Sequence, residues 1–210
     1  MERDNNLPTA SRRHFRTIAL WTVIVGASGG PPLISAQAPS NRELVKLIED
    51  DSTRDAAVQK IVASGNSKAR ELLEWTQGAP KDVNTYRLYL GLAEVFGQLR
   101  MREAIPFLIR NITLEIWPQS PNIWMKSPSA IRGRMPAVSA LIEIGKAASL
   151  ALINEPLEGM PPDRRLATMF VVGQVAGVPE SKEFLNRIIS QANTERFWAE
   201  EGLKHLETQQ

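Results

Sequence analysis

The chain has 210 residues and no cysteine, so it is long enough to bury a core and cannot form disulfide bonds. The segment 1–38 holds four of the 25 Lys and Arg and two of the 23 Asp and Glu, which leaves 21 charges of each sign in the segment 39–210. This balance excludes the concentrated basic face that nucleic-acid binding requires, and one histidine after the leader, His205, argues against a zinc site.

The first predicted segment, residues 1–38, has the three-part plan of a secretory signal peptide. Basic residues precede an uncharged apolar run over 17–27, and the small residues of Ala36-Gln37-Ala38 predict cleavage after Ala38. The run is shorter than the roughly 20 residues of a spanning helix, so no stable membrane span is expected after the signal is removed. An uncleaved anchor or an amphipathic basic helix is the alternative interpretation.

The letters SRRHF at residues 11–15 resemble the twin-arginine export signal, with Arg12, Arg13 and Phe15 at its motif positions. The next two residues depart from the Leu-Lys that often follows, so both the twin-arginine and the general export routes stay open. The resemblance implies a bacterial protein that is periplasmic or secreted.

Helical patterns follow the leader and continue to the end of the chain. Ser40 and Glu43 form a capping box, which predicts a short helix over 40–50. Apolar residues at helical spacing begin again at Ile105, Leu166 and Phe184. Strand-like alternation is scarce, so residues 39–210 are predicted to form one all-α domain.

Four glycines, Gly65, Gly97, Gly145 and Gly177, are each predicted to lie at a turn between two helices, where positive φ suits glycine. The first and last intervals between them are equal, and the middle interval is longer by the length of the segment 113–128, so removing that segment makes the period constant. The positions seven and eight places before and after each glycine are all apolar or aromatic. A fixed period with matching apolar columns indicates a repeat array, in which stacked helical hairpins bury each other's faces.

Two stretches resemble short HEAT-type repeats: EAIPFLIRN at 103–111 and PAVSALIEIGKAASLALI at 136–153. The likeness lies in the A-L-x-x-I-G ending of a first helix and the A-I-P-x-L opening of a second, and it extends loosely over 50–192. It implies a right-handed α-solenoid of about four HEAT-like hairpins with a concave face for partners. Tetratricopeptide repeats have a similar period, but their Trp and Tyr positions do not line up, and Pro106 suits the HEAT pattern better.

Capping helices are expected at both ends of the array. The segment 40–50 covers the front. The segment 194–207 covers the back, with an inward face and the charged residues Glu200, Glu201 and Lys204 outward. The residues expected to point inward are Phe197, Ala199, Leu203 and Leu206.

The insertion TLEIWPQSPNIWMKSP, residues 113–128, interrupts the array with three prolines that disfavour a helix. Its apolar side chains must fold back onto the domain or meet a partner. The first interpretation, a loop packed over the groove between the second and third units, is favoured. The second is a partner site centred on Trp117 and Trp124, with Met125 beside them.

Arginines form the other candidate surface. Arg132 and Arg134 follow the insertion, and Arg164 and Arg165 open the next hairpin. The interval from Arg132 to Arg164 equals the interval between the last two corner glycines, so these arginines occupy equivalent positions in adjacent repeats. Such positions predict a ladder of arginines that meets carboxylates of a partner. Solvated helix starts, some paired with Glu or Asp, are the favoured alternative.

No acid, base and nucleophile occur at a spacing that supports catalysis, and no cofactor or metal site is predicted. Glu94 and Glu143 fall at nearby positions of successive repeats and are weak candidates for one shared surface. We therefore expect a non-catalytic module of the bacterial envelope that binds another protein. The alternatives are an enzyme or lyase-like accessory, with a small-molecule site between the insertion and the concave face, and a purely structural envelope component.

Overall fold

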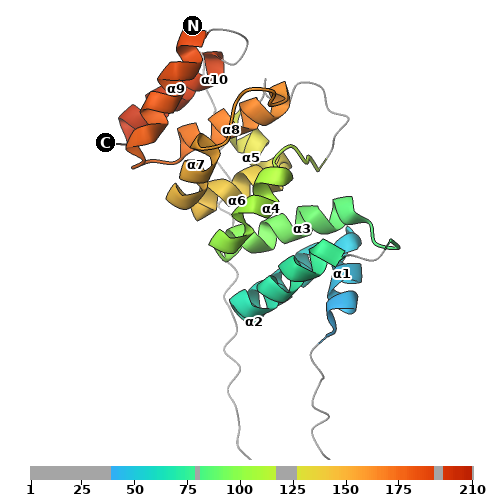
Figure 1. Cartoon of the computed structure of the whole chain (residues 1–210). Coiled ribbons are helices and arrows are strands. Elements are labelled where there is room, and N and C mark those ends of the chain that lie inside the picture. The colour runs from blue at the N-terminus through green and yellow to red at the C-terminus, as the bar shows by residue number, and fades with distance from the viewer. Residues whose placement is uncertain (1–38, 79–80, 117–126, 192–195, 210) are drawn as a thin grey trace, which may run out of the picture. The chain divides into compact units, whose positions relative to one another are not determined.

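The structure is a computed structural model that describes residues 39–78, 81–116, 127–191 and 196–209. These ranges contain helices and turns and no strand, so the predicted all-α class is confirmed (Figure 1). The predicted leader lies outside the described residues. The helices are α1 (Asn41–Glu49), α2 (Arg54–Trp75), α3 (Thr85–Gln98), α4 (Ile105–Arg110), α5 (Pro128–Arg134), α6 (Pro136–Ile144), α7 (Lys146–Ile153), α8 (Pro162–Gln174), α9 (Pro179–Gln191) and α10 (Arg196–Thr208), with 3-10 turns η1 (Thr76–Gly78) and η2 (Arg102–Ala104).

The first helix begins at the predicted capping box. The Ser40 hydroxyl accepts a hydrogen bond from the backbone N–H of Glu43 at 3.3 Å, and the Glu43 carboxylate accepts one from the backbone N–H of Ser40 at 2.7 Å. These bonds satisfy N–H groups that a helix start leaves without an intrahelical partner. The helix then buries Leu44, Val45 and Ile48 against the rest of the domain.

Three of the four predicted corner glycines have the positive φ that a corner requires. The φ angles are 79° at Gly65, 78° at Gly145 and 74° at Gly177. The prediction for Gly97 is wrong, because Gly97 is buried inside α3, and the backbone reverses at Arg100, whose φ is 49°. This corner therefore falls three places later than the period predicts, and the constant period does not hold in the second unit.

The apolar columns nevertheless lie in the core, in spite of the shifted corner. Every column position is buried or packed against the core cluster. The corner is displaced by three residues, which is close to the roughly 3.6 residues of one helical turn. A displacement of about one turn leaves the same face of the helix toward the core. The columns therefore identified the buried faces without fixing the corner.

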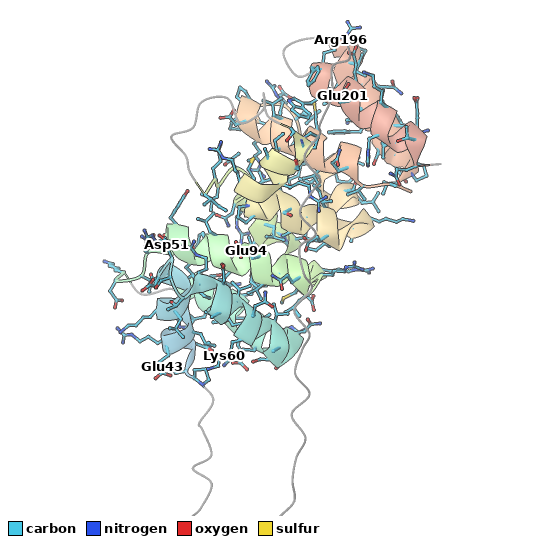
Figure 2. All side chains as sticks on the ribbon, turned by 180° about the vertical axis from the view of Figure 1, so that it is seen from behind. Glu43, Asp51, Lys60, Glu94, Arg196 and Glu201 are labelled. Carbon is cyan, nitrogen blue, oxygen red and sulfur yellow. The ribbon has the colours of Figure 1, made fainter. Side chains whose placement is uncertain are left out.

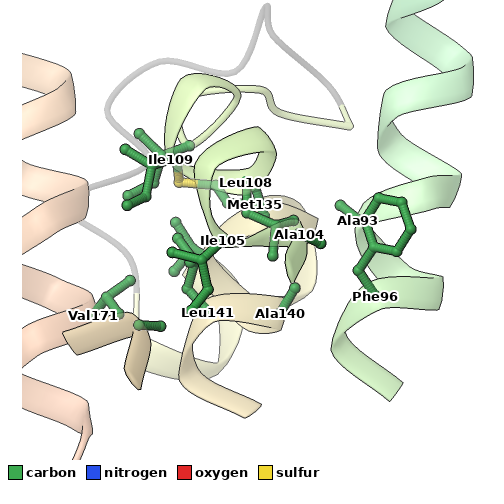
Figure 3. Close-up of a cluster of buried hydrophobic side chains, with 14 of the residues drawn as sticks. Ala93, Phe96, Ala104, Ile105, Leu108, Ile109, Met135, Ala140, Leu141 and Val171 are labelled. Carbon is green, nitrogen blue, oxygen red and sulfur yellow. The ribbon is translucent and has the colours of Figure 1, made fainter. Parts of the chain in front are cut away.

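Packing between helices follows the order of the chain. Successive helix pairs are α3 with α4, α6 with α7 and α8 with α9. The first helices of these pairs contact one another, α3 on α6 and α6 on α8, and α8 contacts α10. The second helices do the same, α4 on α7 and α7 on α9. Figure 3 shows part of the core that results, with Phe96, Leu108, Leu141 and Val171 among its members. A Cβ added at Gly97 would lie 2.8 Å from the Ala140 Cα, so glycine allows α3 and α6 to approach closely.

The inward face predicted for α10 is confirmed for Ala199 and Leu206, which are buried, and for Leu203, which packs against the core, but it is wrong for Phe197. Phe197, predicted inward, is 59% exposed, whereas Trp198 is 8% exposed and its ring packs edge-on against Phe170 at 5.4 Å between centroids. A Cβ on Gly173 would lie 2.6 Å from the Gly202 Cα, so these two glycines form the close contact between α8 and α10. The inward face of α10 consists of Trp198, Ala199, Gly202 and Leu206.

Candidate functional site

One pocket of the described residues lies among the end of α7, the connection over 154–161, the first half of α8 and the middle of α9. We call it the α8–α9 pocket. Its volume is about 660 Å³, within the ~300–1,000 Å³ range of ligand pockets. Apolar and cationic side chains both line it, including Ile153, Leu157, Arg165, Met169, Arg187 and Ile188.

Local sequence explains the walls of this pocket. Helix α7 ends at Ile153 with Asn154 as its C-cap, and the connection turns at Gly159, whose φ is 73°. Helix α8 restarts at Pro162, where the missing N–H costs no hydrogen bond in the first turn. On α9, Arg187 follows the buried pair Phe184 and Leu185, so it lies at the edge of the helix's buried face.

Charges of both signs face the α8–α9 pocket. The Arg164 guanidinium donates to the Glu155 carboxylate at 3.0 Å, so the charge of Glu155 is already balanced. The Arg187 guanidinium lies 5.5 Å from the centre of the Phe184 ring, a cation–π distance. Arg187 is exposed and forms no ion pair within the described residues, so its remaining hydrogen-bond donors are available to a ligand.

A smaller pocket of about 220 Å³ lies between α3 and α6. We call it the α3–α6 pocket. Its lining includes Glu94 and Gln98 from α3, Glu143 from α6, Arg132 from α5, and Ile116 from the described edge of the insertion. The two glutamates that the sequence placed on one surface therefore lie in one pocket.

The close packing of α3 on α6 explains why Glu94 and Glu143 line the same pocket. Gly97 lies against Ala140, and the Glu143 Oε2 atom is 3.0 Å from the position that a Cβ at Gly97 would occupy. Glu94 is half-buried one turn earlier on α3 (Figure 2). Burial, followed by the negative charge of Asp55, raises the pKa of Glu94, while the Arg54 cation acts in the opposite direction.

The described start of the insertion, at Glu115 and Ile116, is bonded to helices α3 and α5. The backbone N–H of Ile116 donates to the carbonyl of Arg134 at 2.8 Å, and the Arg134 guanidinium lies 3.5 Å from the Glu115 carboxylate. The Tyr86 hydroxyl donates to the backbone carbonyl of Glu115. The insertion was also predicted to end in a loop at Pro128, but Pro128 is instead the first residue of α5, with Ser127 as its N-cap.

The predicted arginines are distributed over different surroundings. Arg132 is exposed at the α3–α6 pocket, and Arg165 lines the α8–α9 pocket. Arg134, with a side chain only 13% exposed, and Arg164 each face a glutamate, which favours the paired interpretation for these two. Some predicted positions lie outside the described residues: Trp117, Trp124 and Met125, and the leader residues Arg12, Arg13, Phe15 and Ala38.

Sequence reasoning missed Arg187, the exposed cation of the α8–α9 pocket. Its position after an apolar pair on a helix is typical of any solvated residue. Only the packing of α9 against α7 and α8 brings it into the lining of the same pocket as Arg165, so no local pattern reveals it.

Within the described ranges, no group of three His, Asp or Glu side chains is placed to hold a metal ion. No single described helix is long and apolar enough to span a membrane. The pair Pro136–Ile144 and Lys146–Ile153 meets that requirement only jointly, across a 112° bend. No family model matches the chain, and a search of curated proteins finds no significantly similar sequence.

Proposed function

We propose that this protein is an exported, non-catalytic binding module of the bacterial envelope that holds another protein. In this proposal the leader directs it to the periplasm or the medium. The described domain is a right-handed solenoid of about four HEAT-like hairpins, with α1 and α10 as its caps, and the pockets between hairpins receive the partner.

The stacking of equivalent positions supports the repeat part of the proposal. Ser149 and Ser181 each lie four places after a corner glycine, and their hydroxyl oxygens are 3.3 Å apart in the buried contact of α7 with α9. In a repeat array each unit contacts its neighbours through corresponding residues. The order of helix packing along the chain has the same character.

The α8–α9 pocket is the observation that carries the binding function. It is about 660 Å³ in volume, and its lining joins the half-buried side chains of Ile153 and Leu157 to charged groups. Two of the arginines selected from the sequence belong to it, Arg165 in the lining and Arg164 through its ion pair with the lining residue Glu155. Arginine is enriched at protein interfaces because its planar group forms several directed hydrogen bonds.

A paired capture experiment tests this proposal. The full chain and an Arg165→Glu/Arg187→Glu variant are immobilised and exposed to an envelope extract, and each retained protein is then purified and titrated against both. We expect one protein to bind the wild type directly and the charge-reversed variant at least about tenfold more weakly. Absence of any direct binder, or equal affinity for both forms, would contradict the proposal.

A second candidate function rests on the α3–α6 pocket. This pocket lies between the described edge of the insertion and two core helices, where an enzyme or lyase-like accessory would hold a small molecule. The raised pKa of Glu94 suits a group that exchanges protons nearer neutral pH. Thermal-shift screening of metabolites against wild type and Glu94→Gln tests it: a compound that stabilises only the wild type supports a small-molecule site.

A further inference from the structure

We infer that the α8–α9 pocket takes an acidic peptide segment, an extended stretch in which an apolar side chain lies next to a carboxylate. This inference rests on the proposed binding function and names the chemistry of the partner. It draws on three features of the pocket: its floor, its cation and its polar rim.

The floor of the pocket is apolar. Met169 and Ile188 are buried, so the apolar surface that a ligand can cover comes from Ile153 and Leu157, which are half-buried and packed against the core cluster. An apolar ligand side chain that covers Ile153 and Leu157 removes their exposed surface from water, which favours binding. A purely ionic ligand would leave this surface uncovered.

Charges of both signs line the pocket, and Arg187 is the cation that can serve an acidic ligand. Arg164 already balances Glu155, whereas the Arg187 guanidinium lies over the Phe184 ring and forms no ion pair among the described residues. A planar guanidinium with free donors suits a carboxylate, which accepts two parallel hydrogen bonds. Glu155 and Glu158 on the same walls disfavour a doubly charged phosphate, so a singly charged carboxylate is the better match.

The rim supplies a group for a peptide backbone. Asn154 is exposed at the pocket, and its side-chain amide offers both donors and an acceptor. A peptide unit presents the complementary N–H and C=O, which neither a fatty acid nor an inorganic anion can do. The combination of amide, guanidinium and apolar floor therefore favours a peptide over other carboxylates.

Fluorescence anisotropy with defined peptides tests the inference. A short fluorescein-labelled peptide of alternating Leu and Asp is compared with matched peptides in which Asn or Lys replaces every Asp. We expect the Asp peptide to bind the full chain about tenfold more tightly than either matched peptide, with an affinity that falls as salt rises. Equal binding of the Asp and Asn peptides would overturn the inference.

Three variants locate the site. Arg187→Gln is expected to weaken binding of the Asp peptide about tenfold, and Glu158→Gln to tighten it about twofold. Arg196→Gln removes an equally exposed arginine on α10, where Arg196 pairs with Glu200, and is expected to leave binding unchanged (Figure 2). All three positions are exposed, so circular dichroism should show the same fold for each.

A loss with Arg187→Gln no greater than with Arg196→Gln would also overturn the inference. The outcome is separable from that of the proposed function. A partner that binds directly and needs Arg165 and Arg187, together with no preference for the Asp peptide, leaves the binding function standing and removes only the acidic-peptide assignment.

Discussion

Gly97 shows how one missing side chain decides the contact between two helices. Its Cα faces Ala140 so closely that an added Cβ would lie 2.8 Å from a backbone atom, which cannot move aside without shifting α6. The sequence suggested that Gly97 serves a turn, because glycine tolerates positive φ. Its actual role is steric, and Arg100 adopts the positive φ three places later.

Replacement of Gly97 by alanine should therefore destabilise the domain. We expect Gly97→Ala to lower the free energy of unfolding by about 2–3 kcal/mol through overpacking, measured by urea denaturation. Gly133→Ala is the matched control, because Gly133 lies in α5 with nothing within 4 Å of an added Cβ. The control should be neutral or more stable by up to about 1 kcal/mol. A similar loss at both positions would contradict the steric role.

Glu94 is expected to make the stability of the folded domain depend on pH. Its pKa in the folded state is raised above 4.5, mainly by burial and then by Asp55. The groups that face it are Asp55 and Arg54 on α2, with Arg132 and Glu143 in the same pocket. The folded state therefore binds the proton more tightly than the unfolded state, and stability falls as pH rises from below 4.5 through the raised pKa.

Glu94→Gln removes this dependence. We expect the variant to gain stability relative to wild type as pH rises from 4 to 7, measured by denaturant titration at each pH. Glu43→Gln is the control of opposite sign, because hydrogen bonds from Ser40 lower the pKa of Glu43, and the stability that Glu43 contributes is present above 4.5 and lost as pH falls. If the stability of both variants relative to wild type changed with pH in the same direction, the opposite pKa shifts of Glu94 and Glu43 would be contradicted.

Among the elements, α10 shows that periodicity finds the buried side of a helix but not its edge: Ala199 and Leu206 are buried as predicted, and Phe197 is not. The letters RFWAEEGLKHLET allow either Phe197 or Trp198 to face the core, because neighbouring residues differ by about 100° around the axis. The close contact of Gly202 with Gly173 selects the second orientation. Trp198 then packs on Phe170, and Phe197 remains 59% exposed.

Alanine substitutions distinguish the two orientations of α10. Trp198→Ala should lower the free energy of unfolding by about 3–5 kcal/mol, because it empties a buried aromatic site. Phe197→Ala should cost about 1 kcal/mol or less, since it loses only an edge-to-face contact with Trp198 at 5.2 Å. Thermal melts of both variants provide the measurement, and a larger loss at Phe197 would restore the orientation predicted from the sequence.

In the whole molecule, the predicted export signal and the folded domain occupy separate parts of the chain. Residues 1–38, the predicted leader, and the chain after them differ in charge, because only residues 1–38 have an excess of basic residues. We expect export of the full chain when it is expressed in a bacterial host, and the mass of the exported protein tests cleavage after Ala38.

Substitution of the arginine pair then identifies the export route. Arg12→Lys/Arg13→Lys keeps the positive charge that the general route reads and removes the pair that the twin-arginine route requires. Loss of the exported form in the variant indicates the twin-arginine route, and unchanged export indicates the general one. Retention of the wild type in the cytoplasm would reject the predicted address altogether.

The helical class, the capped start of α1, three of the corners and the buried faces could be predicted from the sequence, because they depend on local periodicity, capping groups and glycine φ. The corner at Arg100, the exposure of Phe197 and the presence of Arg187 in the pocket that Arg165 lines depend on tertiary packing. Each of these depends on how closely two helices approach. The distance between two helices depends on both of the surfaces in contact, as for Gly97 and Ala140, and these residues lie far apart in the sequence.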